Sequence, residues 1–191
     1  MGSPVVELLA DLAAALDGVR VPWFLFGAQA AILHGAARLT ADVDVTVRLP
    51  ETMSNEALTE ELEHRRFRRR IVDTTFIQQT RVIPFLHVPT ELPLDIVLAG
   101  PGLEDTFFDR VQMRDIDGVR VRLASPEDIV VMKTLAGRSK DLDDVIAILR
   151  AHGDRLDSRY VETTLTTLEQ ALSQSDLLST FRQTAARVHR R

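Results

Sequence analysis

The chain has 191 residues and a formal net charge of −5 at pH 7, with 45% hydrophobic and 27% charged residues. This length and balance are typical of one globular domain, with or without a small appended lobe, and they exclude an intrinsically disordered chain. The absence of cysteine excludes disulfides, thiolate zinc sites and cysteine nucleophiles. No apolar run is as long as a membrane span, and the negative charge argues against a general nucleic-acid-coating surface. We therefore expect a cytoplasmic protein without a membrane partner.

The first two thirds of the chain mix predicted helices with predicted strands. Apolar residues at helical spacing predict helices at 5–16, 29–36 and 55–65. Short apolar or alternating runs predict strands at 21–26, 43–49, 81–88 and 94–98. Asp117-Gly118 is a dipeptide that type I′ turns prefer, and it predicts a hairpin between strands at 113–115 and 119–123.

Only helical patterns follow this hairpin. Ser125 and Pro126 form the N-cap and first position of one helix, and the expected helices are 126–136, 140–151, 158–172 and 175–190. The sequence therefore predicts an α+β fold: a mixed sheet flanked by helices in residues 1–124, followed by a C-terminal helical region in residues 125–191.

Two aspartates alternate at the start of one predicted strand. In the run Asp42-Val43-Asp44-Val45, the valines point to one face of the sheet and the aspartates to the other. Two carboxylates held this close repel each other unless a cation lies between them, and oxygen donors suit Mg²⁺ or Mn²⁺. Taken alone, the pair also fits a solvated strand end.

Two other segments favour the metal interpretation. Gly27-Ala28 lies where a buried strand meets a helix, and a glycine allows close approach to the backbone there. Asp95 is a single carboxylate in an otherwise apolar strand, where a third metal ligand would explain it. A surface position on an edge strand would explain Asp95 equally well.

These residues resemble the nucleotidyltransferase fold of the DNA polymerase β superfamily. That pattern has a glycine turn, two alternate carboxylates on a strand and a third carboxylate on a later strand. The longer string GAQAAILHGAARLTADVDV is similar to the AbiEii-like and MenT-like toxin nucleotidyltransferases. In that subgroup a histidine-glycine pair, an arginine and a threonine precede the carboxylates, as His34-Gly35, Arg38 and Thr40 do here. The resemblance covers about residues 20–150.

The resemblance implies an enzyme that uses an NTP and Mg²⁺ or Mn²⁺. Asp42 and Asp44 would hold two metal ions, and Asp95 would hold the ion beside the attacking hydroxyl or act as the base. With Lys133 these aspartates form the predicted catalytic set. The predicted nucleotide contacts are Gly27, Ala28, Arg38, Thr40, Lys133 and Asp144. His34 is expected to pack behind the turn.

Ala28, the acidic residues at 141–144 and the two lysines each need a further comment. Ala28 stands where the family has glycine or serine, so only backbone amides could bind the terminal phosphate at this position. Asp141, Asp143 and Asp144 begin a predicted helix, where acidic residues complement the helix dipole. Arginine supplies 21 of the 23 basic residues, so the two lysines, Lys133 and Lys140, are either remnants of a genomic bias or functional.

The strongest basic cluster is the run at residues 64–70. It predicts an RNA contact formed by Arg65, Arg66, Arg68, Arg69 and Arg70 around Phe67. The alternative is a solvated helix end that leads into a strand, with Phe67 packed inward.

The sequence therefore predicts transfer of a nucleoside monophosphate from an NTP to a hydroxyl acceptor. By resemblance the acceptor is tRNA, and the protein is the toxin of a toxin-antitoxin pair with an antitoxin protein as its partner. One alternative is nucleotidylation of a small molecule such as an aminoglycoside. The other is a degenerate fold that binds a nucleotide or a partner protein without turnover, which the missing hydroxyl at Ala28 favours.

Overall fold

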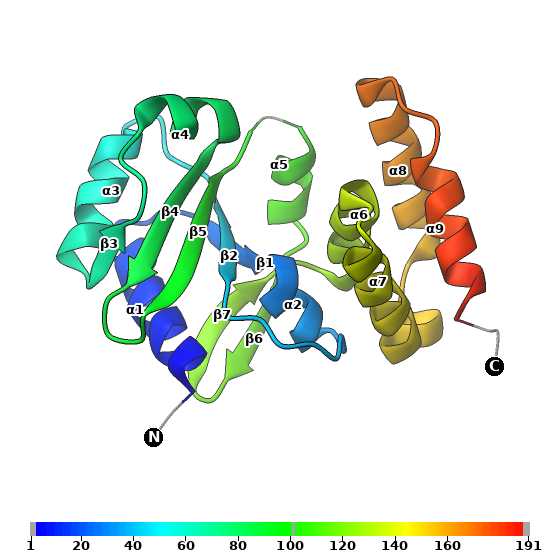
Figure 1. Ribbon diagram of the computed structural model, residues 1–191, viewed down its shortest axis with the longest axis horizontal. Coiled ribbons are helices and arrows are strands. Elements are labelled where there is room, and N and C mark those ends of the chain that lie inside the picture. Colours follow the sequence, from blue (N-terminus) through cyan, green and yellow to red (C-terminus); the bar gives the residue numbers. More distant parts are fainter. Residues whose placement is uncertain (1–2, 101, 189–191) are drawn as a thin grey trace. The chain divides into compact units, whose positions relative to one another are not determined.

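The computed structural model describes residues 3–100 and 102–188 (Figure 1). The chain divides into two compact units, each described here by itself. The first comprises Met1–Gln29 and Thr40–Ala124, and the second comprises Ala30–Leu39 and Ser125–Arg191. Residues 30–39, expected to belong with the sheet, are thus grouped with the C-terminal helices.

The first unit is built on a seven-stranded mixed sheet with the order β3-β4-β5-β2-β1-β7-β6. Its strands are β1 (Trp23–Phe26), β2 (Val43–Val47), β3 (Phe67–Arg69), β4 (Val82–His87), β5 (Leu92–Leu98), β6 (Gln112–Ile116) and β7 (Val119–Leu123). The pairs β2–β5 and β1–β7 are parallel, and the others are antiparallel. Asp117 and Gly118 both have positive φ, as the predicted hairpin turn requires.

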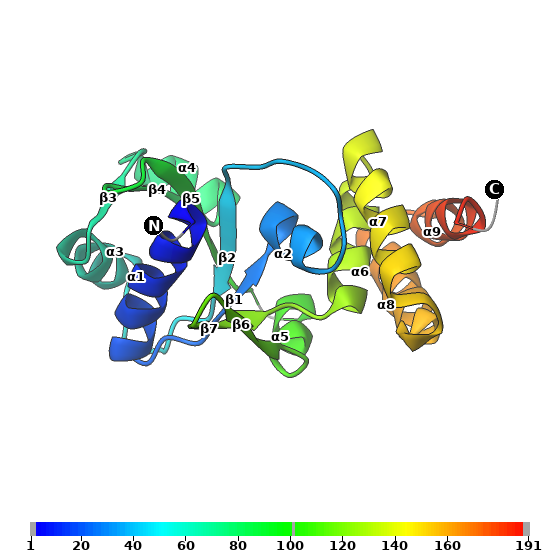
Figure 2. The same ribbon diagram turned by 90° about the horizontal axis from the view of Figure 1, so that it is seen from below.

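One face of the sheet forms the main core. Val43, Val45 and Val47 are fully buried, and so is Ile96 on the neighbouring strand β5. Helix α1 (Pro4–Gly18) contacts β5 and β7 and buries a row of leucines, while α3 (Asn55–His64) contacts α1 and β3 (Figure 2). The alternation read from the sequence is confirmed, because the valines of β2 lie in the core and Asp44 lies on the opposite face.

Two short elements were not predicted, α4 (Thr74–Thr80) and α5 (Leu103–Phe108), and β3 was expected only in the alternative explanation of the basic run. Strand β3 has three residues, two of them arginine, and it exists because it pairs with β4 and buries Phe67. Helix α4 has no buried residue and depends on an N-cap, in which Asp73 accepts a hydrogen bond from the Thr75 amide. Such elements lack the periodic apolar pattern on which sequence reasoning depends.

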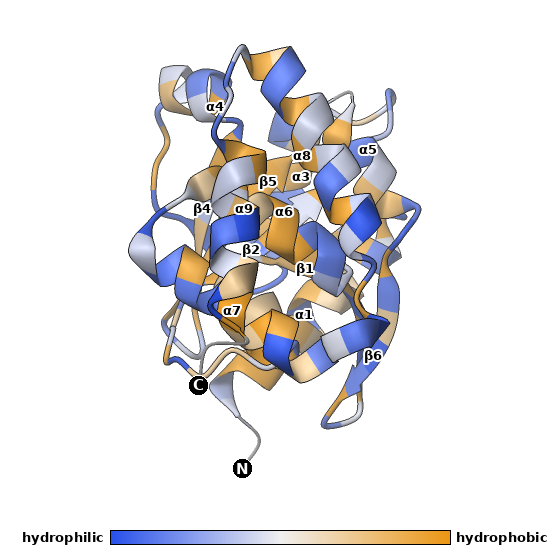
Figure 3. Ribbon diagram, turned by 90° about the vertical axis from the view of Figure 1, so that its right-hand side faces the viewer, coloured by the Kyte–Doolittle hydropathy of each residue, from blue (hydrophilic) through white to orange (hydrophobic). Residues whose placement is uncertain are grey.

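The second unit consists of packed helices. Helix α2 (Gly27–Leu33) starts in the first unit and continues into the second, where the helices are α6 (Pro126–Ala136), α7 (Ser139–His152), α8 (Ser158–Leu172) and α9 (Leu177–Ala186), with a 3₁₀ turn at Gly153–Arg155. Helices α7 and α9 carry both apolar and hydrophilic colours in Figure 3. Ser125 caps α6 by accepting a hydrogen bond from the Asp128 amide, as predicted.

The predicted α+β architecture, a mixed sheet flanked by helices with helices after it, is confirmed. Helix α9 is shorter than the expected helix at 175–190, whose last two positions lie outside the described residues. Over the part of the chain that is described, no helix has both the length and the apolar character needed to cross a membrane.

Candidate active site

The predicted carboxylates meet on adjacent parallel strands. Asp44 of β2 is the register partner of Asp95 of β5, so both side chains leave the sheet on the same face, from strands about 4.8 Å apart. Asp42 is exposed just before β2, and its backbone amide donates to the Thr40 hydroxyl at 3.3 Å. Partial burial is the main influence that raises the pKa of Asp95, and the negative charge of Asp42 adds to it.

Gly27 makes room for Asp44. It lies directly after β1 and has a φ of +68°, a conformation that other residues rarely adopt. A Cβ atom at this position would lie less than 3.0 Å from three side-chain atoms of Asp44. Strand β1 sets this contact, because Phe26 is the register partner of Asp44. The glycine is therefore required by the position of a predicted metal ligand as well as by the turn.

Asp95 is held by an arginine. The Nη2 atom of Arg70 donates to Asp95 Oδ1 at 2.5 Å, and the Nε atom of Arg70 donates to the Phe85 carbonyl at 2.9 Å. Partial burial raises the pKa of Asp95 above its ordinary value, although the Arg70 guanidinium opposes this increase. The sequence predicted an RNA contact for Arg70 and did not reveal its pairing with Asp95. The two residues are 25 positions apart, and strand β4 lies between them.

The carboxylates fit a divalent cation in their chemistry and placement. Oxygen donors on neighbouring strands suit Mg²⁺ or Mn²⁺, the absence of a side chain at Gly27 lets the Asp44 carboxylate pack against the turn, and the Arg70 guanidinium already stands in as a cation on Asp95. Among the described residues, however, no three acidic or histidine side chains are arranged to hold a metal as they stand. The donor set is present, and Asp95 is turned toward Arg70.

Lys133 lies in a buried ionic network of the second unit. Its Nζ atom is 3.1 Å from Asp141 Oδ1 and 2.8 Å from Asp144 Oδ2. The Arg38 guanidinium lies 2.9 Å from the same oxygen of Asp144. Lys133 and Arg38, two predicted nucleotide contacts, thus both contact a third, Asp144.

Asp141 is the network residue that sequence reasoning assigned to a helix dipole. Its side chain is fully buried, and it accepts from Lys133 and from the Arg138 Nε atom at 2.5 Å. Burial disfavours the charged form, but the hydrogen bonds from Arg138 and Lys133 outweigh it and hold the pKa of Asp141 below its ordinary value. The spacing Lys140-Asp141…Asp144 was visible in the sequence, but the partner on the preceding helix was not.

The basic run is largely neutralised within the first unit. Four of its five arginines pair with carboxylates: Arg65 with Glu61, Arg66 with Glu7 and Asp11, Arg69 with Glu63, and Arg70 with Asp95. Arg68 is exposed and forms no ion pair with any described residue. Phe67 is buried and packs beside His87, as the non-functional alternative expected. The RNA contact stays a prediction.

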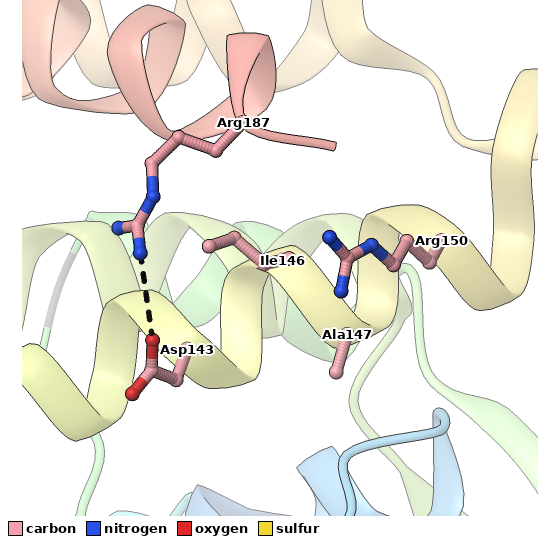
Figure 4. A pocket seen from close by; sticks show the side chains of 5 residues that line it. All are labelled: Asp143, Ile146, Ala147, Arg150 and Arg187. Atoms are coloured by element: carbon pink, nitrogen blue, oxygen red, sulfur yellow. Dashed lines mark ion pairs between the residues drawn. The ribbon is translucent and has the colours of Figure 1, made fainter. Parts of the chain in front are cut away.

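The remaining predicted site residues have structural contacts. The Thr40 carbonyl accepts from the Gln29 side chain at 3.1 Å, and Ala28 is buried. His34 is buried beside His152, with ring centroids 5.3 Å apart, in agreement with the expected packing role. A cavity of about 420 Å³ in the second unit is lined by other residues: Asp143, Ile146, Ala147, Arg150 and Arg187 (Figure 4). Arg187 lies 4.0 Å from Asp143 across it.

Comparison with solved structures identifies the fold. An antigenic nucleotidyltransferase-like protein from Paracoccidioides brasiliensis is 21% identical, with a TM-score of 0.59 over 92% of this chain and 91% of that one. The antibiotic-resistance factor ANT(2″)-Ia, solved with adenylyl-2″-tobramycin, is 18% identical, with a TM-score of 0.59 over 95% and 98% of the chains. The lincosamide antibiotic adenylyltransferase LnuA is 12% identical, with a TM-score of 0.50 over 78% and 96%.

No functionally curated protein gives a significant match to the sequence. Residues 5–188 match the model of a family described as "Nucleotidyltransferase of unknown function (DUF6036)". The resemblance to nucleotidyltransferases read from the Gly27, Asp42, Asp44 and Asp95 pattern is therefore confirmed at the level of the fold. Because this match spans nearly the whole sequence, the chain belongs to this nucleotidyltransferase family and is an enzyme of that class.

Proposed function

We propose that this enzyme transfers a nucleoside monophosphate from an NTP to a hydroxyl acceptor, with Asp42, Asp44 and Asp95 as its catalytic carboxylates. The observation that carries the proposal is the register of β2 and β5, which brings Asp44 and Asp95 together on one face of the sheet. Gly27 supports it, because the Asp44 carboxylate packs directly against the backbone of this turn and any larger residue there would clash with it.

The proposed reaction forms one bond and breaks one bond. The acceptor oxygen attacks the α-phosphorus of the NTP, and the bond from that phosphorus to the bridging oxygen breaks to release pyrophosphate. Asp42 and Asp44 would hold Mg²⁺ or Mn²⁺, which supplies charge neutralisation for the triphosphate when bound. Asp95 would share in this binding or accept the proton of the hydroxyl as a general base.

The nucleotide contacts in this proposal are Gly27, Ala28, Arg38, Thr40, Lys133 and Asp144. Lys133 and Arg38 are cations of the kind that bind phosphate, Lys133 as a point charge and Arg38 as a bidentate donor. Both are held by Asp144 in this structure. Asp144 would accordingly orient Lys133 and Arg38 so that these two cations can also bind the triphosphate.

For the acceptor we favour tRNA, and for the biological role a toxin restrained by an antitoxin protein in the manner of the AbiEii-like and MenT-like enzymes. The support is the string from His34 to Asp44 together with Lys133 and Asp144. Exposed Arg68 is available to an RNA backbone, whereas the other arginines of the run would have to exchange a carboxylate for a phosphate.

The test is label transfer from each α-labelled NTP to total RNA with Mg²⁺ or Mn²⁺. We expect labelled tRNA from the wild type and at least a hundredfold loss in Asp42→Ala and in Asp44→Ala, each checked for folding by thermal unfolding. Asp143→Ala is the matched control, since it removes an exposed carboxylate outside the proposed site. Absence of labelling with all four NTPs and both metals would contradict the proposal.

The second candidate acceptor is a small molecule, and two solved neighbours, ANT(2″)-Ia and LnuA, are named for antibiotics. The cavity in Figure 4 carries Arg150 and Arg187 against the single carboxylate of Asp143, and this excess of positive charge disfavours a polycationic aminoglycoside. Growth of expressing cells on antibiotics separates this candidate from the RNA candidate. A non-catalytic nucleotide-binding module would instead bind an NTP with equal affinity in the wild type and in Asp42→Asn.

A further inference from the structure

Arg70 is anchored in a way that the other arginines of its run are not. It follows β3, and its backbone amide donates to the Pro84 carbonyl of β4 at 2.8 Å. Its Nε atom donates to the Phe85 carbonyl at 2.9 Å, which leaves Nη2 to reach across β4 to Asp95 on β5. Three contacts therefore fix a guanidinium on a carboxylate of the proposed metal site.

We propose that Arg70 is a positioning residue that occupies Asp95 in place of the divalent cation and must release it when the metal binds. The inference rests on the proposed function, because it takes Asp95 to be a metal ligand. Arg70 thereby sets the metal affinity of the site and compensates the charge of Asp95 when no metal is bound.

The geometry supports competition between Arg70 and the metal. Arg70 binds Oδ1 of Asp95, and Asp44 on the adjacent strand projects from the same face of the sheet. A guanidinium on Asp95 offsets the repulsion between this carboxylate and Asp42, as a metal would.

The ion pair can also be exchanged. The Arg70 and Asp95 side chains are 39% and 36% exposed, and pairs with this access to solvent are weak enough for a divalent cation to displace. The hydrogen bond from Nε to the Phe85 carbonyl does not involve Asp95, so it can keep Arg70 in place after Nη2 lets go. The released Nη2 would then carry a positive charge at the edge of the site.

The test is Mn²⁺ binding to the protein without nucleotide, in which electron paramagnetic resonance measures the free ion. We expect Arg70→Ala to bind Mn²⁺ about tenfold more tightly than the wild type, and Arg70→Lys to lie between the two. Arg68→Ala is the matched control, because it removes an equal charge two residues away that forms no ion pair with a described residue. Its affinity should stay within twofold of the wild type.

A second measurement follows the guanidinium directly. In protein with labelled arginine side chains, rotation about the Arg70 Nε–Cζ bond should be slow without metal and become fast when Mg²⁺ is added, whereas Arg68 should rotate fast in both conditions. This measurement needs no variant, so the inference remains testable if Arg70→Ala does not fold.

The outcomes distinguish the two proposals. Unchanged or weaker Mn²⁺ binding in Arg70→Ala, with wild-type binding that depends on Asp44, overturns the role of Arg70 and leaves the metal site intact. An equal gain in Arg68→Ala also overturns it, because general charge would then be the cause. Wild-type protein that binds no Mn²⁺, or binds it equally in Asp44→Ala, contradicts the metal site itself and the inference with it.

Discussion

Replacing Lys133 with methionine tests the buried ionic network of the second unit. The substitution keeps an apolar chain of similar length and removes the ammonium group, with its charge and its hydrogen-bond donors. Lys133 is 7% exposed, and its ammonium group contacts both Asp141 and Asp144. The variant therefore leaves two buried carboxylates, each with one cation fewer.

The magnitude follows from what remains around each carboxylate. Removing one partner of a buried ion pair costs about 3–5 kcal/mol, because the other charge is left without compensation. Here Asp141 keeps Arg138, whose side chain is largely exposed, and Asp144 keeps Arg38. These arginines lower the expected loss in the free energy of unfolding to about 2–4 kcal/mol.

The assay is urea unfolding at pH 7, with Lys140→Met as the control. Lys140 is the only other lysine and is exposed on the first turn of α7, so its loss should change the free energy of unfolding by less than about 0.5 kcal/mol. The double variant of Lys133→Met with Asp141→Asn should lose less than the sum of the single variants, because the two residues interact. Equal stability of the two lysine variants would refute the network.

Three further predictions concern the proposed site. Lys133→Arg should reduce nucleotidyl transfer at least tenfold while keeping the charge, since a planar guanidinium does not fit where an ammonium bridges two carboxylates; wild-type turnover in a label-transfer assay would refute this. Gly27→Ala should abolish Asp44-dependent Mn²⁺ binding and lower the free energy of unfolding by about 1–3 kcal/mol, because the position combines positive φ with a clash against Asp44. Asp95→Asn should raise the free energy of unfolding at pH 7 by up to about 1 kcal/mol, a small value because the pair is partly exposed. The folded-state pKa of Asp95 is raised, so its ionisation destabilises the fold above that pKa, and the gain should vanish as the pH falls below about 3.8 in chemical denaturation.

Local patterns in the sequence predicted the parts of the fold that depend on burial. The alternating valines of β2, the leucines of α1 and the Asp117-Gly118 turn each specify one element and the face that it buries. Helix α4 escaped prediction because it depends on its N-cap and buries no residue, and β3 was expected only in the alternative explanation of the basic run. Phe67 makes β3 a strand only because β4 lies beside it, and no periodic signal can arise from three residues.

The same limit applies to the candidate site. Asp42, Asp44 and Asp95 were identified because an acidic residue in an apolar strand is locally unusual. The partner of Asp95 was not identified, because in the sequence Arg70 is only one member of a basic run. The strand order β3-β4-β5 brings Arg70 to Asp95, and this order cannot be read from local patterns. Chemistry-bearing residues were therefore visible in the sequence, whereas the contacts that control them depend on strand order.

The two lysines of this arginine-rich chain have different explanations in the structure. Lys140 is exposed, and its surroundings give no physical reason for a lysine rather than an arginine. Lys133 bridges two carboxylates one helical turn apart on α7, between positions that Arg38 and Arg138 already fill with guanidinium groups. A compact ammonium is the cation that suits this place. The Arg38–Asp144 pair, with Gly35 packed closely on Ala151 and His34 beside His152, also attaches residues 30–39 to α7. Residues 30–39, which lie between the glycine turn and the two aspartates, thus fold with the C-terminal helices. The pairing of Arg38 with Asp144, which Lys133 also contacts, fixes the C-terminal end of this segment.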